Sequence, residues 1–120
     1  ASSAASDVYK RQIHMEAKEL SELEILDRAL HELENYYNCY QTEKTKSKLS
    51  HLKKDREKAC NNMYGYVKFI KRELTENPYI LSVIQDGSSF QFEDFVTHVD
   101  SDMPDYLKKI RSRIEALKEE

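Results

Sequence analysis

Apolar residues in the first half of the chain recur every three or four positions between residues 16 and 41. This spacing keeps them on one side of an α-helix. Acidic residues occupy most of the other side. The pattern therefore predicts a long amphipathic helix over 16–41. Its apolar stripe consists of Leu23, Leu26, Leu30, Leu33, Tyr37 and Tyr40.

A second helical pattern covers residues 48–74. The two patterns are separated by the polar stretch 41–47. It contains threonine and serine, which often cap helices through their hydroxyl groups. We therefore expect an antiparallel helical hairpin with its turn near Lys44. The apolar stripe of the second helix is Leu49, Leu52, Cys60, Met63, Val67, Ile70 and Leu74.

A turn near Lys44 also predicts which residues of the two helices face each other. At the turn end, the tyrosines Tyr36, Tyr37 and Tyr40 are expected beside Leu49 and Leu52.

Further from the turn, Leu23 and Leu26 are expected near Asn62 and Gly65. A glycine inside a helix costs about 1 kcal/mol relative to alanine, so Gly65 suggests a close backbone approach or a bend.

The C-terminal third is harder to interpret. Residues 79–85 fit a short helix, but 79–92 also fit a small β-hairpin with its turn at Asp86 and Gly87. We favour the helix, because an isolated two-stranded hairpin is marginal in water. Short helices are expected at 92–99 and 104–118. The predicted fold is all-α, a long antiparallel hairpin packed with two or three shorter C-terminal helices.

The first residues have no apolar period. Residues 2–12, SSAASDVYKRQ, resemble a translated sequencing-adaptor read-through, and a genuine disordered tail is the alternative. We expect 1–12 to be a non-native or tail segment and 13–120 to form a single helical domain. If the segment is non-native, we expect the native chain to start somewhere from Ile13 onward or to be the C-terminal piece of a longer protein.

Composition narrows the class of protein. The chain has 120 residues, enough for one domain, and only 2 glycines and 2 prolines. Such scarcity argues against turn-rich β-folds and Gly-rich phosphate loops. No run approaches the length of about 20 apolar residues that a membrane span needs. We therefore expect a cytoplasmic protein with no membrane partner.

Charge is separated along the chain, although the formal net charge is only −3. Residues 16–34 hold seven acidic and two basic side chains, whereas 43–58 hold seven basic and three acidic ones. Three interpretations of the basic segment stay open. It forms a solvated helix end, it contacts nucleic-acid phosphates while nearby tyrosines stack on bases, or it docks an acidic protein partner or another copy of this chain.

Catalytic chemistry has little support in the sequence. Cys39 and Cys60 lack zinc or disulfide spacing, and the histidines form no ligand pair. We expect no enzyme activity, no metal and no cofactor, and propose a non-catalytic protein-interaction or self-association module. The alternative is a nucleic-acid-binding accessory protein using 44–58. The candidate binding residues are Lys44, Lys46, Lys48, Lys53, Lys54, Arg56, Lys58, Tyr36, Tyr37 and Tyr40.

Overall fold

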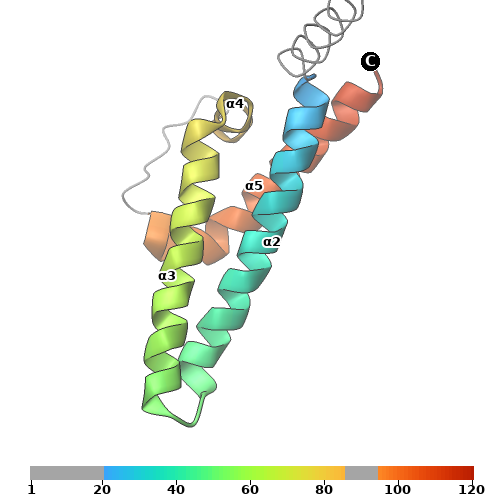
Figure 1. Cartoon of the computed structure of the whole chain (residues 1–120). Helices are drawn as coiled ribbons and strands as arrows, with labels where there is room; N and C mark the ends of the chain where they lie inside the picture. The colour runs from blue at the N-terminus through green and yellow to red at the C-terminus, as the bar shows by residue number, and fades with distance from the viewer. Residues whose placement is uncertain (1–20, 86–94) are drawn as a thin grey trace, which may run out of the picture.

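A computed structural model describes residues 21–85 and 95–120, and the regular elements within these ranges are all helices. Helices α2 and α3 form an antiparallel hairpin, α5 crosses behind it, and α4 lies at its open end (Figure 1). The predicted all-α hairpin is confirmed. Residues 1–12 and 86–92, including the predicted terminal segment and the turn of the alternative β-hairpin, lie outside the described residues. The helices are α2 (Glu22–Leu49), α3 (Lys53–Glu76), α4 (Pro78–Gln85) and α5 (Phe95–Lys118).

Two of the helices begin at polar capping residues. The Ser21 hydroxyl accepts a hydrogen bond from the backbone N–H of Glu24 at 3.2 Å and caps α2. The Asn77 side chain accepts from the backbone N–H groups of Tyr79 and Ile80 at 3.1 and 3.3 Å. With Asn77 as the cap and Pro78 in the first turn, 78–85 form α4, and the helical interpretation of 79–85 is confirmed.

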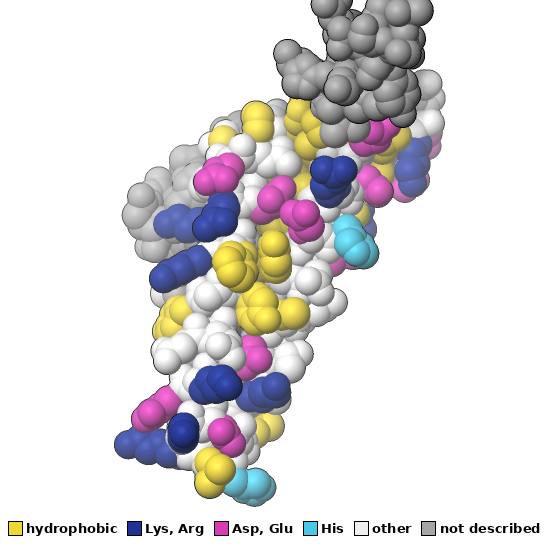
Figure 2. All heavy atoms as spheres, in the orientation of Figure 1, with side chains coloured by type: hydrophobic (Ala, Val, Ile, Leu, Met, Phe, Trp, Pro, Cys, Tyr) yellow, Lys and Arg dark blue, Asp and Glu magenta, His cyan; other side chains and the backbone are white. Residues whose placement is uncertain are grey.

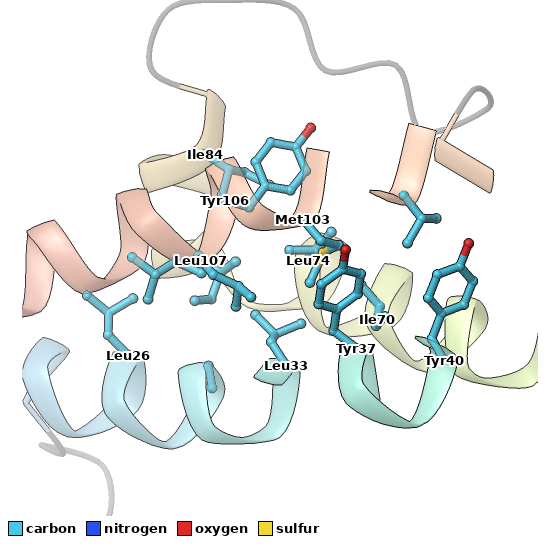
Figure 3. Packing of buried hydrophobic residues seen from close by; sticks show 14 of the residues in the cluster. Leu26, Leu33, Tyr37, Tyr40, Ile70, Leu74, Ile84, Met103, Tyr106 and Leu107 are labelled. Atoms are coloured by element: carbon cyan, nitrogen blue, oxygen red, sulfur yellow. The ribbon is translucent and has the colours of Figure 1, made fainter. Parts of the chain in front are cut away.

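The hydrophobic core lies where α5 and α4 pack on the hairpin. Leu26, Leu33 and Tyr37 of α2 point toward α5, where Met103 and Leu107 meet them (Figure 3). Large side chains that are almost fully buried come from all four helices, so each contributes to one core. They are Leu26, Leu33, Ile70, Leu74, Ile80, Ile84, Val99, Met103 and Ile110.

The position of the turn was predicted wrongly. Helix α2 continues to Leu49, and the connection to α3 is only residues 50–52. The reason lies in the polar stretch 41–47, because its hydroxyl groups do not cap a new helix. They donate instead to carbonyl groups three or four residues earlier in α2. These bonds are Thr42 to Asn38 at 3.1 Å, Thr45 to Gln41 at 3.1 Å and Ser47 to Lys44 at 2.6 Å.

The predicted register is wrong for the same reason. Leu49 and Leu52 lie at the turn itself and are 73% and 64% exposed, far from being packed on the tyrosines. Tyr36 packs instead on Phe69, with ring centroids 5.5 Å apart.

The expectation for Gly65 also fails. A Cβ added at Gly65 would meet nothing within 4 Å, so no close backbone approach requires the glycine. Helix α3 continues through this position without interruption.

The last helix is longer than predicted. Instead of separate helices at 92–99 and 104–118, α5 runs unbroken from Phe95 to Lys118 and contains Pro104. Pro104 is exposed, while a continuous buried stripe follows the other side of the helix. Burial of this stripe outweighs the cost of an internal proline. The stripe is Val99, Met103, Tyr106, Leu107, Ile110 and Ile114.

Candidate functional site

The predicted basic segment brackets the turn of the hairpin. Lys44, Lys46 and Lys48 end α2, and the other four basic residues begin α3. The segment therefore forms the far end of the α2–α3 hairpin rather than the start of a second helix. We call the part of the hairpin that leads to this end the two-helix arm. In Figure 1 this end projects beyond α5, and Figure 2 shows basic side chains gathered there. The four residues on α3 are Lys53, Lys54, Arg56 and Lys58.

Lys44 is engaged inside the fold. Its ammonium group forms an ion pair with Asp100 of α5 and lies 5.8 Å from the ring centroid of Tyr40. The Tyr40 hydroxyl also donates to Asp100, at 3.5 Å. The hydrogen bond to Asp100 raises the pKa of Lys44. This cluster joins α2 to α5. The main role of Lys44 is therefore to hold these two helices together.

Arg56 is also engaged, at the turn. Its guanidinium donates to the backbone carbonyl groups of Ser50 at 2.8 Å and His51 at 3.1 Å. These carbonyls directly follow the last turn of α2. Helix α3 has no side-chain cap at Leu52, so Arg56 is the side chain that fastens the connection.

The remaining lysines are free or only weakly paired. Lys46 lies 3.9 Å from the half-buried Glu43 and Lys53 lies 3.9 Å from the exposed Glu57, each pair within one helix. Pairs of this kind contribute about 0.3–0.5 kcal/mol. No ion pair joins the other three lysines to any residue in 21–85 or 95–120. These free lysines are Lys48, Lys54 and Lys58.

Two exposed leucines lie in the same segment as these lysines. Leu49 and Leu52 are the most exposed large hydrophobic side chains in the described part of the chain. We call the exposed lysines and leucines at this end the hairpin tip. It comprises Lys46, Lys48, Leu49, Leu52, Lys53, Lys54 and Lys58.

The three candidate tyrosines lie elsewhere. Tyr37 and Tyr40 are buried and stack on each other with centroids 6.0 Å apart. Burial is the main cause that raises the pKa of both phenols, and the charge of Asp100 raises them further. Tyr36 is half-buried and faces α3. The lysines and tyrosines therefore do not form one continuous surface.

Sequence reasoning missed Phe69, which accompanies Tyr36. Phe69 contacts Tyr36 and also the ring of Tyr66, at 6.2 Å in an edge-on arrangement. Phe69 falls outside the predicted apolar stripe of α3. A large aromatic residue off the buried stripe is the signal that could have revealed this second surface.

The two arginines of α5 are engaged in contacts with α2. Arg113 donates to Glu22 through two bonds of 3.1 and 3.0 Å, and Arg111 pairs with Glu34 at 2.7 Å. The hydrogen bond to Glu22 raises the pKa of Arg113. A hollow of about 500 Å³ between α2, α4 and α5 includes Glu22, Arg113 and Lys108 in its lining. Its charges are mainly neutralised within the fold.

No three His, Cys, Asp or Glu side chains within 21–85 and 95–120 are grouped so as to hold a metal ion. Cys39 and Cys60 are half-buried free thiols. Helices long and apolar enough to cross a membrane are absent from these same ranges.

Comparison with protein-family models, with curated proteins and with solved structures finds no match to this chain. Function therefore has to be argued from the geometry of the chain itself.

Proposed function

We propose that the chain is a non-catalytic interaction module that binds an acidic surface of a protein partner through its hairpin tip. One observation carries the proposal, the presence of free lysines around two exposed leucines at the end of a projecting arm. Charge attracts and orients an acidic partner during encounter. The leucines then add affinity, because full burial of one leucine is worth about 1.5–3 kcal/mol.

The proposal narrows the candidate residues. The proposed binding residues are the lysines Lys46, Lys48, Lys53, Lys54 and Lys58, together with Leu49 and Leu52. Lys44 and Arg56 contribute by holding the arm in shape. Both cysteines are free thiols, which fits a reducing compartment, and a cytoplasmic location is part of the proposal.

Nucleic-acid binding remains the alternative, because the free lysines Lys48, Lys54 and Lys58 could equally contact phosphates. Stacking on bases needs an exposed aromatic face near these cations. Tyr37 and Tyr40 are buried, which favours the protein partner over the nucleic acid.

The test compares two double charge reversals with the same net charge. Lys48→Glu/Lys54→Glu changes the tip, and Lys71→Glu/Lys108→Glu changes exposed lysines elsewhere. Immobilised chain is exposed to extract from its source cells, and retained proteins are identified after cross-linking. We expect an acidic protein that is retained by the wild type and the control but lost with the tip variant and with Leu49→Ser/Leu52→Ser. Equal retention by the two double charge-reversal variants would overturn the proposal.

A parallel measurement decides the alternative. Binding of single-stranded and duplex oligonucleotides is measured at two salt concentrations. Binding that weakens steeply with salt and is lost in the tip variant would replace the protein partner by nucleic acid. Absence of binding at low salt would remove the alternative.

A further inference from the structure

One side of the hairpin is not covered by another described helix. Helix α5 packs on the side where Leu33 and Tyr37 point, and it crosses behind α2 and α3 in Figure 1. On the side toward the viewer, Figure 2 shows hydrophobic side chains grouped midway along the α2–α3 pair. We call this side the open face.

The open face carries an aromatic patch, defined as Tyr36, Tyr66 and Phe69. Tyr36 of α2 contacts Phe69 across the seam of the two helices, and Phe69 contacts Tyr66 on its own helix. Phe69 is 43% exposed, so the patch presents apolar surface to solvent. Exposed aromatic groups of this kind are typical of protein interfaces.

The patch lies between two shallow hollows of the same seam, both lined by α2 and α3. The hollow toward the start of α2 is lined in part by Glu24, Arg28 and Glu73. The hollow toward the turn is lined in part by Lys46 and Lys58. The apolar centre is thus flanked by polar rims, the usual arrangement of an interface.

Charge along the hairpin changes sign about the patch. Residues 22–34 of α2 hold five acidic side chains and one basic one, although Glu22 and Glu34 pair with α5. The residues around the turn, 43–58, hold seven basic and three acidic side chains, although Lys44 and Arg56 are engaged within the fold. Tyr36 lies at the midpoint of α2, which spans Glu22–Leu49. Such a surface is acidic at one end, basic at the other and apolar at its centre. It is therefore complementary to a second copy of itself rotated by 180°.

We propose that a second copy of this chain packs on the open face, antiparallel to the first, with patch on patch. A two-fold axis through Tyr36 places the acidic start of each α2 beside the basic tip of the other copy. Glu24 lies twelve residues before Tyr36 and Lys46 ten residues after it, which corresponds to about 18 and 15 Å along the helix. The two side chains therefore come within a helical turn of each other across the interface.

The open face is large enough for a stable dimer. A helix of 28 residues is about 42 Å long, and two helices side by side are about 20 Å wide. Their common face therefore offers about 800 Å² per copy, the size of a standard protein interface. The dimer shares the basic tip with the acidic partner proposed above, but its test uses the purified chain alone, so its failure would leave that proposal standing.

The first experiment measures the molar mass of the full chain by sedimentation from micromolar to millimolar concentration. We expect a monomer–dimer equilibrium that Phe69→Ser weakens by about tenfold or more. Tyr64→Ser is the matched control, because Tyr64 is 46% exposed on the same helix but lies about 140° around its axis from Phe69. The control is expected to dimerise within about twofold of the wild type. A monomer throughout the range, or equal loss in both variants, would overturn the proposal.

A charge exchange tests the antiparallel orientation. Glu24→Lys and Lys46→Glu alone should each weaken the dimer by about threefold to tenfold at low salt. The double variant should recover most of that loss, because the pair is restored with its signs exchanged. Additive losses in the double variant would exclude this orientation. Circular dichroism of each variant shows whether it has kept its helices.

Discussion

Lysine and arginine residues that look equivalent along 44–58 have different roles in the fold. Lys44 pairs with Asp100, Arg56 holds the end of α2, and Lys48 makes no ion pair with the described residues. The sequence correctly indicates where the positive charge collects. It does not indicate which charges are used internally, because their acceptors, Asp100 and a backbone carbonyl, become neighbours only after folding.

Arg56 leads to a prediction about the turn. Arg56→Ala removes two hydrogen bonds to carbonyls at the end of α2 and should lower the free energy of unfolding by about 1–2 kcal/mol. Arg56→Lys keeps the charge, but both bonds are donated by Nη1, which the shorter lysine side chain does not reach, so it should recover less than half of the loss. Urea unfolding measures both, with Lys54→Ala as the control that is expected to be nearly neutral. A loss equal to that of the control would contradict the capping role.

Tyr106 leads to a prediction about pH. Burial, with the charges of Asp102 and Asp105, raises its pKa from 10.0 to about 12. Above pH 10 the unfolded chain releases this proton while the folded chain keeps it, so the free energy of unfolding falls as pH rises from 10 toward 12. Tyr106→Phe should make this alkaline loss less steep, and Tyr64→Phe, at an exposed tyrosine, should not. Urea unfolding at a series of pH values would contradict the assignment if Tyr106→Phe followed the wild-type profile.

At the scale of single helices, periodicity identifies the elements better than it identifies their ends. The stripe from Leu23 to Tyr40 correctly predicts α2, because each of its members faces the core or its margin. The end of α2 was missed, since threonine and serine hydroxyls can bond either as caps or back into their own helix. Packing of α3 along α2 selects bonding back into the helix. This packing is a tertiary contact, which the local sequence does not predict.

Local sequence also misplaces the start of α5. Proline usually ends or kinks a helix, so separate helices on either side of Pro104 were the natural prediction. The stripe from Val99 to Ile114 stays buried through this position, and only one continuous helix can bury all of it. Tertiary packing here overrides local preference.

Pro104 should therefore carry a measurable cost. Pro104→Ala restores a backbone donor and removes the ring from a helix interior, where proline costs about 3 kcal/mol relative to alanine. Part of that gain is offset by greater freedom of the unfolded chain. We expect the free energy of unfolding to rise by about 1–2 kcal/mol in urea titrations. Ser112→Ala, also exposed on α5, is the control and should gain only a few tenths of a kcal/mol. Destabilisation by Pro104→Ala would mean that α5 depends on the proline.

On the scale of the whole molecule, the chain is elongated. It extends over 66 × 37 × 24 Å with a radius of gyration of 19.0 Å, whereas a compact chain of this length has about 14 Å. The two-helix arm accounts for this shape, since the core cluster of α2 ends at Tyr40 and that of α3 begins at Val67. Sequence length and composition do not predict such an arm. Only the late turn at residues 50–52 moves the basic segment away from the core.

The arm should also be the least stable part of the hairpin. Amide protons exchange through local opening, which costs less where few apolar groups are buried. At concentrations where the chain is monomeric, amides of α2 in 43–49 and of α3 in 53–58 should therefore exchange faster than those in 26–40 and 67–74. Hydrogen exchange followed by mass spectrometry measures this gradient within single helices, so helix propensity alone does not explain it. At higher concentration the antiparallel dimer should protect 43–58 selectively. Uniform protection along α2 in the dilute monomer would show that the arm is held by contacts other than the core described above.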